Sequence, residues 1–283
     1  VAISGAVAKV ILGYHVVFEG FDGKANEVSP EDRYWWIAII CGVLSGLLGG
    51  LWSMLLLLGV HLKTGLRGSI LATYAFAFFC AVLLTCTGYW DNGITWGSGF
   101  SEANILLTTN HTTGRHDDKE DPPLYFFLTK MIATTLSYLT GIPGGIFAPT
   151  ITVGIAFGNF LAEAIIQRID DRIPRPLVCV MAATGYFAGV TQSPITSAAI
   201  MVGMIDMRGS YIPAVILSAV LGWLSAQLIS PKALYGALSE ARLPPLPPES
   251  LQPELKALPP PQYRSKTDDT LKDHFIEVSI SLK

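Results

Sequence analysis

A short stretch in the middle of the chain, Gly141–Pro149, combines residue types that can hold an anion without a charged side chain. It reads Gly-Ile-Pro-Gly-Gly-Ile-Phe-Ala-Pro, and an apolar run follows it. Pro149 suits the first turn of a helix, where its missing N–H costs nothing. The unpaired backbone N–H groups of that turn, together with the helix dipole, form an anion site. The alternative is a loop before a helix, in which the glycines serve only the turn.

The composition indicates that this stretch belongs to a membrane protein. Of the 283 residues, 51% are hydrophobic and 14% are charged, whereas a soluble domain has about 25% charged residues. The net charge of −3 argues against nucleic acid as a partner. Backbone donors suit an ion that must enter and leave, because a fixed cationic side chain would hold an anion more tightly.

Apolar segments dominate the chain up to about residue 230, and several are shorter than the roughly 20 residues that a helix needs to cross a bilayer. Short apolar segments interrupted by glycine and proline are typical of broken helices that meet near the middle of the membrane. We therefore predict an all-α membrane protein. The expected segments are Val1–Val17, Trp35–Val60, Ser69–Thr87, Leu124–Leu139, Ile142–Ile166, Leu177–Val190, Ile195–Ile205 and Tyr211–Ile229.

The stretch Gly145–Pro149 resembles the GxFxP signature of CLC chloride channels and chloride/proton antiporters. Further matches follow in chain order over roughly residues 1–240, at Gly97–Phe100, Gly185–Gly189, Gln192–Thr196 and Pro231–Tyr235. The chain is thus similar to the C-terminal half of a bacterial-like CLC protein without CBS domains. The resemblance implies a bundle of tilted and broken helices. It places the end of the first repeat at 1–62, the second inverted repeat at 63–239, and a Pro-rich, disordered tail at 240–283.

The resemblance also implies which residues bind chloride. In the family, the backbone amides of the Ile-Phe pair bind the central ion, which implies Ile146 and Phe147, flanked here by Gly145 and Ala148. A tyrosine hydroxyl at the start of the last family helix contacts the same ion, and Tyr235 occupies that position. Without the family, Tyr235 would be interpreted as an aromatic anchor at the membrane interface. Chloride is the expected transported ion, and no cofactor, metal or catalytic residue is expected.

Proton coupling depends on the segment that aligns with Val1–Val17. Family antiporters carry an acid near the end of that helix, and Val16 occupies the position here. Valine cannot relay a proton, which favours a passive channel. Glu19, if the alignment shifts by three residues, and His15, which titrates near neutral pH, are the candidates for a proton pathway. Proton-coupled exchange is therefore the alternative function.

Two family motifs are absent from the sequence: GSGIP, and GREGP with its gating glutamate. Both belong to the first half of a family member, and the chain begins with Val rather than Met, so we expect a fragment. A truncated, non-conducting product is a further alternative. A membrane enzyme would need a polar catalytic constellation at membrane depth, and the sequence contains none.

The remaining expectations concern partners and location. We expect a homodimer in the lipid bilayer of a bacterial inner membrane or a plasma membrane. A metal site is not expected in the polar loop Thr108–Pro123, because its histidines and acids lack a ligand spacing. The segments implied at the dimer interface are apolar and nearly uncharged. They are Val1–Val16, Trp35–Gly50, Thr191–Met204 and Tyr211–Ile229.

Overall fold

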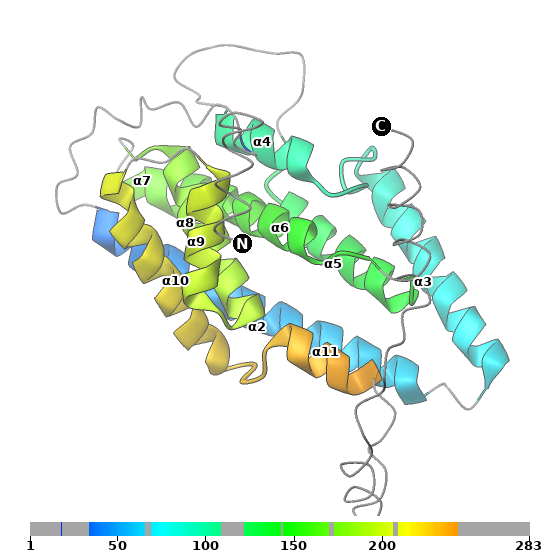
Figure 1. Cartoon of the computed structure of the whole chain (residues 1–283). Helices are drawn as coiled ribbons and strands as arrows, with labels where there is room; N and C mark the ends of the chain where they lie inside the picture. The colour runs from blue at the N-terminus through cyan, green and yellow to red at the C-terminus, as the bar shows by residue number, and fades with distance from the viewer. Residues whose placement is uncertain are drawn as a thin grey trace, which may run out of the picture. The chain divides into compact units, whose positions relative to one another are not determined.

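The computed structural model describes residues 18, 34–65, 69–108, 122–142, 144–169, 173–205 and 209–242, which form a bundle of helices (Figure 1). These ranges contain no β-strand, only an isolated parallel bridge between Phe18 and Ile205. The all-α prediction is confirmed. The elements are α2 Tyr34–Gly65, α3 Ile70–Trp90, α4 Phe100–Thr108, α5 Phe126–Leu139, α6 Phe147–Leu161, the π-helical turn Ala162–Ile166, α7 Gln167–Ile169, α8 Arg175–Thr191, α9 Pro194–Met204, the 3-10 turn Gly209–Tyr211, α10 Ile212–Gln227 and α11 Leu234–Arg242.

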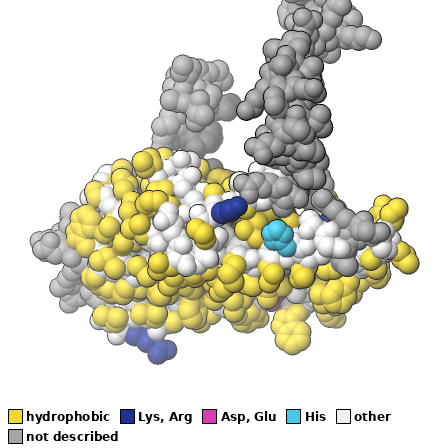
Figure 2. All heavy atoms as spheres, turned by 90° about the horizontal axis from the view of Figure 1, so that it is seen from below, with side chains coloured by type: hydrophobic (Ala, Val, Ile, Leu, Met, Phe, Trp, Pro, Cys, Tyr) yellow, Lys and Arg dark blue, Asp and Glu magenta, His cyan; other side chains and the backbone are white. Residues whose placement is uncertain are grey.

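Four helical stretches in the described part of the chain are long and apolar enough to cross a membrane: Trp35–Gly65, Ile70–Trp90, Phe147–Ile166 and Gly209–Gln227. A helix of the 32 residues of α2 rises about 48 Å, which exceeds the roughly 30 Å apolar thickness of a bilayer, so α2 must tilt or protrude. Figure 2 shows a face covered largely by hydrophobic side chains. The chain is an integral membrane protein.

The centre of the bundle is α8, which packs against α2, α6 and α10. Its residues from Arg175 to Val190 are all buried. A helix that is apolar around its whole circumference belongs inside a bundle. Pro176 in its first turn costs no hydrogen bond, and α8 ends at Gln192, whose backbone is left-handed at φ 56°. Helix α8 thus places α6, whose first turn belongs to the candidate site, and α6 in turn packs against α5.

Glycines let α2, α8 and α10 approach at backbone distance. A Cβ added to Gly46 of α2 would lie 2.2 Å from the carbonyl oxygen of Gly222 on α10, and one added to Gly222 would lie 2.4 Å from that of Gly185 on α8. No side chain fits in either place. Small residues at helix contacts are the usual means of close packing in membranes, where water drives no apolar burial.

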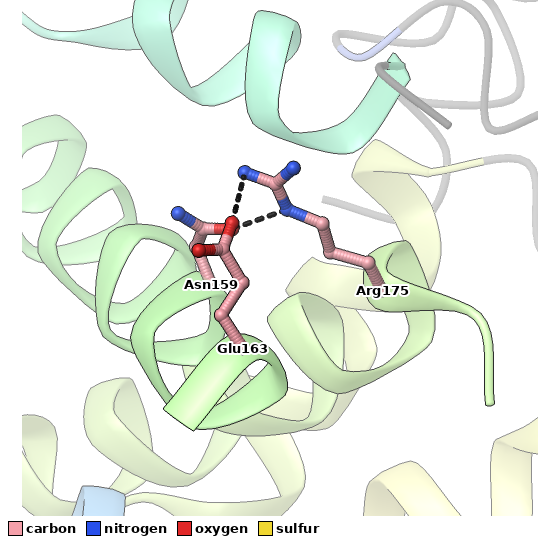
Figure 3. A network of polar contacts seen from close by, with 3 residues as sticks. All are labelled: Asn159, Glu163 and Arg175. Atoms are coloured by element: carbon pink, nitrogen blue, oxygen red, sulfur yellow. Dashed lines mark hydrogen bonds and ion pairs between the residues drawn. The ribbon is translucent and has the colours of Figure 1, made fainter. Parts of the chain in front are cut away.

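A buried polar network joins α8 to the end of α6 (Figure 3). Arg175 is 4% exposed; its Nε donates to Oδ1 of Asn159, and its Nη2 lies 3.3 Å from Oε1 of Glu163. Asn159 is in α6 and Glu163 is in the π-helical turn that continues it. The guanidinium thus lies near the C-terminal end of α6, where the helix dipole favours a positive charge.

Most of the expected apolar segments correspond to described helices, with boundaries that differ by a few residues. Within the expected apolar segment Ile142–Ile166 the helix begins at Phe147, which agrees with the placement of Pro149 in a first turn, and the glycines before it form a loop. The sequence did not predict α4, a nine-residue helix with a mixed composition. Helix α11 continues to Arg242, slightly beyond the expected start of the tail at 240. Val1–Val17 and the tail from Leu243 onward lie outside the described residues.

Candidate functional site

The N-terminus of α6 has backbone donors without helical partners. The helix begins at Phe147, and no side chain caps it. Its first intrahelical bond runs from the Thr150 N–H to the Ile146 carbonyl, at 3.0 Å. Pro149, in the first turn as expected, contributes no N–H. The N–H groups of Ile146, Phe147 and Ala148 therefore stand at the positive end of the dipole, where an anion can accept from them.

This helix start opens onto a cavity of about 550 Å³, large enough for an ion together with water. Its walls come from the α3–α4 region, from α5 and from the connection between α5 and α6. Gly145, Ile146 and Ala148, three of the residues predicted to surround chloride, line it. The other lining residues are Leu84, Thr85, Thr95, Trp96, Gly97, Ser98, Lys130, Ala133, Thr134, Ser137, Tyr138, Ile142, Gly144 and Pro149.

Lys130 of α5 lines the cavity and is 1% exposed. Its Nζ donates to the carbonyl oxygens of Thr95 and Gly97, at 2.8 and 2.9 Å. A Cβ added to Gly99, whose φ is +84°, would lie 3.0 Å from Cε of Lys130, so glycine admits the lysine stem. Both bonded acceptors are neutral carbonyls. The carboxylate of Glu102 in α4 also interacts with the ammonium and offsets part of its charge, so the positive charge that Lys130 adds to the cavity wall is reduced.

The sequence reasoning did not identify Lys130, although the sequence contained a signal for it. This lysine is the one charged residue between Phe126 and Leu139, an otherwise apolar helix. An ionisable residue at membrane depth is by itself a reason to suspect a functional site.

Hydroxyl groups add polarity to the same cavity but not all of them can donate into it. The Oγ1 atom of Thr85 donates to the Ala81 carbonyl, and that of Thr134 donates to the Lys130 carbonyl, at 3.0 and 2.7 Å. A hydroxyl has a single proton, so these two present only lone pairs to the cavity. The Thr95 hydroxyl, which also lines the cavity, has no hydrogen-bond partner among the described residues and can donate to an anion, as can the backbone amides and the ammonium.

Phe147 and Tyr235 do not belong to the set of described residues that line the cavity. The ring of Phe147 packs edge-on against Phe187 of α8, with centroids 5.4 Å apart, so its side chain belongs to the contact between α6 and α8. Tyr235 lies in α11, which contacts α2 and α8. Partial burial, with a smaller effect from Tyr138 of the cavity wall, raises the pKa of the Tyr235 phenol, which therefore stays a neutral donor.

Gln192 links the end of α8 to the segment that leads into α11. Its Nε2 donates to the carbonyl oxygens of Gly189 and Ser230, at 3.0 and 3.2 Å. Ser230 is 4% exposed, and its hydroxyl donates to the Lys232 carbonyl. These bonds hold the chain shortly before Tyr235 against the end of α8. The position of Tyr235 therefore depends on that of the central helix.

The expected proton-pathway residues, His15 and Glu19, lie outside the described residues, as does Val16. Their neighbour Phe18 is described: it is 1% exposed, its N–H donates to the Met204 carbonyl at 3.2 Å, and its ring packs on that of Phe100. Most of the polar loop 108–123 is also outside the description. Among the residues that are described, no cluster of His, Cys, Asp and Glu could hold a metal ion.

Comparison with known proteins agrees with this architecture. The family model described as voltage gated chloride channel matches residues 1–227. The H(+)/Cl(-) exchange transporter ClcA of Salmonella paratyphi A is 24% identical over 251 residues, which cover 84% of this chain and 50% of that transporter. Transporters of the same name from Vibrio campbellii and Klebsiella pneumoniae are 23% and 22% identical, over 84% and 86% of this chain and 50% and 51% of their own length. The chain thus spans about half the length of the curated relatives it matches.

Proposed function

The chain belongs to the voltage-gated chloride channel family, and on that premise we propose that it supplies part of a pathway that carries chloride across a membrane. The observation that carries the proposal is the uncapped start of α6 at a cavity with a buried ammonium in its wall. The dipole of α6 and the single ammonium of Lys130 in the wall attract an anion without surrounding it with charge, which allows the ion to leave.

Within this pathway we assign the central chloride to the backbone N–H groups of Ile146 and Phe147, between Gly145 and Ala148. Tyr235 is proposed to add one neutral hydrogen bond from its phenol. The electrostatic effect of Tyr138, a cavity residue, on the Tyr235 phenol supports this proposal.

We propose that transport is coupled to protons. The support is that the relatives at 22–24% identity are named H(+)/Cl(-) exchange transporters. This differs from the passive channel that the sequence favoured. Passive conduction is the second candidate, and Val16, at the position of the family's proton-accepting residue, is the observation that favours it.

One experiment separates the two functions. The intact protein is reconstituted in vesicles with a chloride gradient, and the pH inside is followed. Exchange predicts uphill proton movement driven by chloride, and a channel predicts chloride flux without it. If the vesicles show no chloride flux, with or without proton movement, the transport proposal is wrong. Variants Glu19→Gln and His15→Gln then show which side chain, if either, takes part in proton movement.

Further proposals concern organisation. We propose repeat boundaries at 62 and 239, as the family resemblance implies, a bacterial inner membrane as the location, and a homodimer. Of the segments expected at the dimer interface, Trp35–Gly50 already has its glycine face against α8 and α10. The apolar, exposed side chains of α9 and α10, such as Ile195 and Ile216, are better candidates for the contact. Crosslinking in bilayers that yields only monomer would contradict the dimer.

A further inference from the structure

The last turn of α2 holds the end of α5 through Lys63. Its Nζ donates to the carbonyl oxygen of Leu139, the last residue of α5, at 2.9 Å. The final carbonyls of a helix have no partner within it, and the negative end of the dipole favours a cation there. A side chain of α2 thus provides what α5 lacks at its end.

The same end of α2 also receives the Leu139 side chain. A Cβ added to Gly59, one turn before Lys63, would lie 2.9 Å from both Cδ atoms of Leu139. Leu139 is 8% exposed. Its carbonyl and its side chain are therefore both fixed by residues of α2.

The ammonium lies where a side chain on residue 141 would otherwise begin. A Cβ on Gly141 would lie 2.2 Å from Nζ of Lys63, and the φ of Gly141 is +89°, which other residues rarely adopt. Gly141 is the first residue after Thr140, where the chain leaves α5 and turns toward the cavity.

Beyond this point the connection has few supports of its own. A Cβ added to Gly144 or Gly145 would meet nothing within 4 Å, and both residues line the cavity. The next well-buried residue is Ile146, at 6% exposed, where α6 begins. The described part of the connection is thus anchored at its two ends, by Lys63 at one and by the start of α6 at the other.

We propose that Lys63 is a positioning residue of the anion site. By fixing where the chain leaves α5, Lys63 sets the path of the connection that leads through the cavity wall to the α6 N–H groups. This inference rests on the proposed chloride function. Lys63 acts through Leu139 and Gly141 and is not itself a chloride ligand.

The intact protein is titrated with sodium chloride, and sodium gluconate keeps the ionic strength constant. The titration gives the dissociation constant for chloride. The unfolding temperature of each variant is measured separately. Lys63→Met removes the bond to Leu139, and Gly141→Ala displaces the ammonium without removing its charge. Each is expected to weaken chloride binding about fivefold or more, the lower range of coupling between sites. In the double variant, chloride binding should be weakened by less than the product of the two single effects, because both substitutions break the same contact between Lys63 and Leu139.

The control is His61→Gln, an exposed change in the same part of α2, which should leave chloride binding unchanged. A lower unfolding temperature with unchanged chloride affinity in Lys63→Met would show a purely structural lysine and overturn the inference. If that variant does not fold, Lys63→Gln provides the same comparison. Absence of chloride binding by the wild-type protein would instead overturn the proposed function, and the inference with it.

Discussion

Replacement of Lys130 by methionine tests whether the cavity attracts an anion. Methionine has a similar length and no charge, so the variant keeps the α5 stem against Gly99 and removes the ammonium. It also leaves the carbonyls of Thr95 and Gly97 without their donor, at the two bonds of 2.8 and 2.9 Å. The main effect of the substitution is therefore the loss of a positive charge, and the loss of two hydrogen bonds is a smaller, local effect.

The size of the cavity gives the expected effect. A sphere of about 550 Å³ is about 10 Å across, and we take that diameter as the working distance between the ammonium and an anion in the cavity. With an effective dielectric constant of about 20, two unit charges 10 Å apart attract by about 1.7 kcal/mol. Loss of that attraction corresponds to a chloride affinity up to about 15-fold weaker, and the Glu102 carboxylate, which offsets part of the lysine charge, reduces the effect.

The assay is calorimetric titration of the intact protein with chloride at constant ionic strength. Ser137→Ala changes a neutral residue of the same cavity wall and should alter the dissociation constant much less. Thermal unfolding confirms that both variants fold. If Lys130→Met binds chloride within twofold of the wild type, the ammonium does not act on the ion and the electrostatic reasoning is wrong.

Two further predictions concern the second ligand and the packing of the bundle. Tyr235→Phe removes one neutral hydrogen bond, worth about 0.5–1.5 kcal/mol, and should weaken chloride binding about 2- to 12-fold in the same titration; an unchanged constant would remove Tyr235 from the site. Gly46→Leu places a side chain 2.2 Å from the Gly222 carbonyl, so α2 and α10 must separate. We expect a loss of about 1–3 kcal/mol or more, seen as a lower unfolding temperature, whereas Gly203→Ala, which has open space around its Cβ, should unfold like the wild type.

The sequence predicted the helices best where apolar residues run continuously. Helices α2, α3 and α10 follow directly from such runs, and the helix start after Gly145 followed from the placement of Pro149. The short helix α4 was missed because its nine residues include Ser101, Glu102 and Asn104 and show no strong pattern. Its position depends on contacts with α6 and α8, which are remote in the chain.

The candidate site was only partly predictable for a related reason. The glycine-rich stretch identified the backbone donors, because donors at a helix start depend on local sequence. The roles of Lys130 and Lys63 depend on partners far along the chain, at Thr95 and Leu139. Such pairs cannot be read from spacing in one sequence, although a lone lysine in an apolar helix is a reason to look for one.

The packing of α8 has a consequence for motion. On one side, Gly154 and Gly158 of α6 approach the α8 backbone at Ala183 and Cys179; on its other sides the glycine contacts with α2 and α10 are equally close. Surfaces in backbone contact cannot slide past each other without a collision, and packed cores switch between discrete arrangements rather than deform gradually. These helices should therefore move together as one stiff block. Any rearrangement that opens or closes the route of an ion would then fall to more loosely held parts, such as α3, the α5–α6 connection and α11.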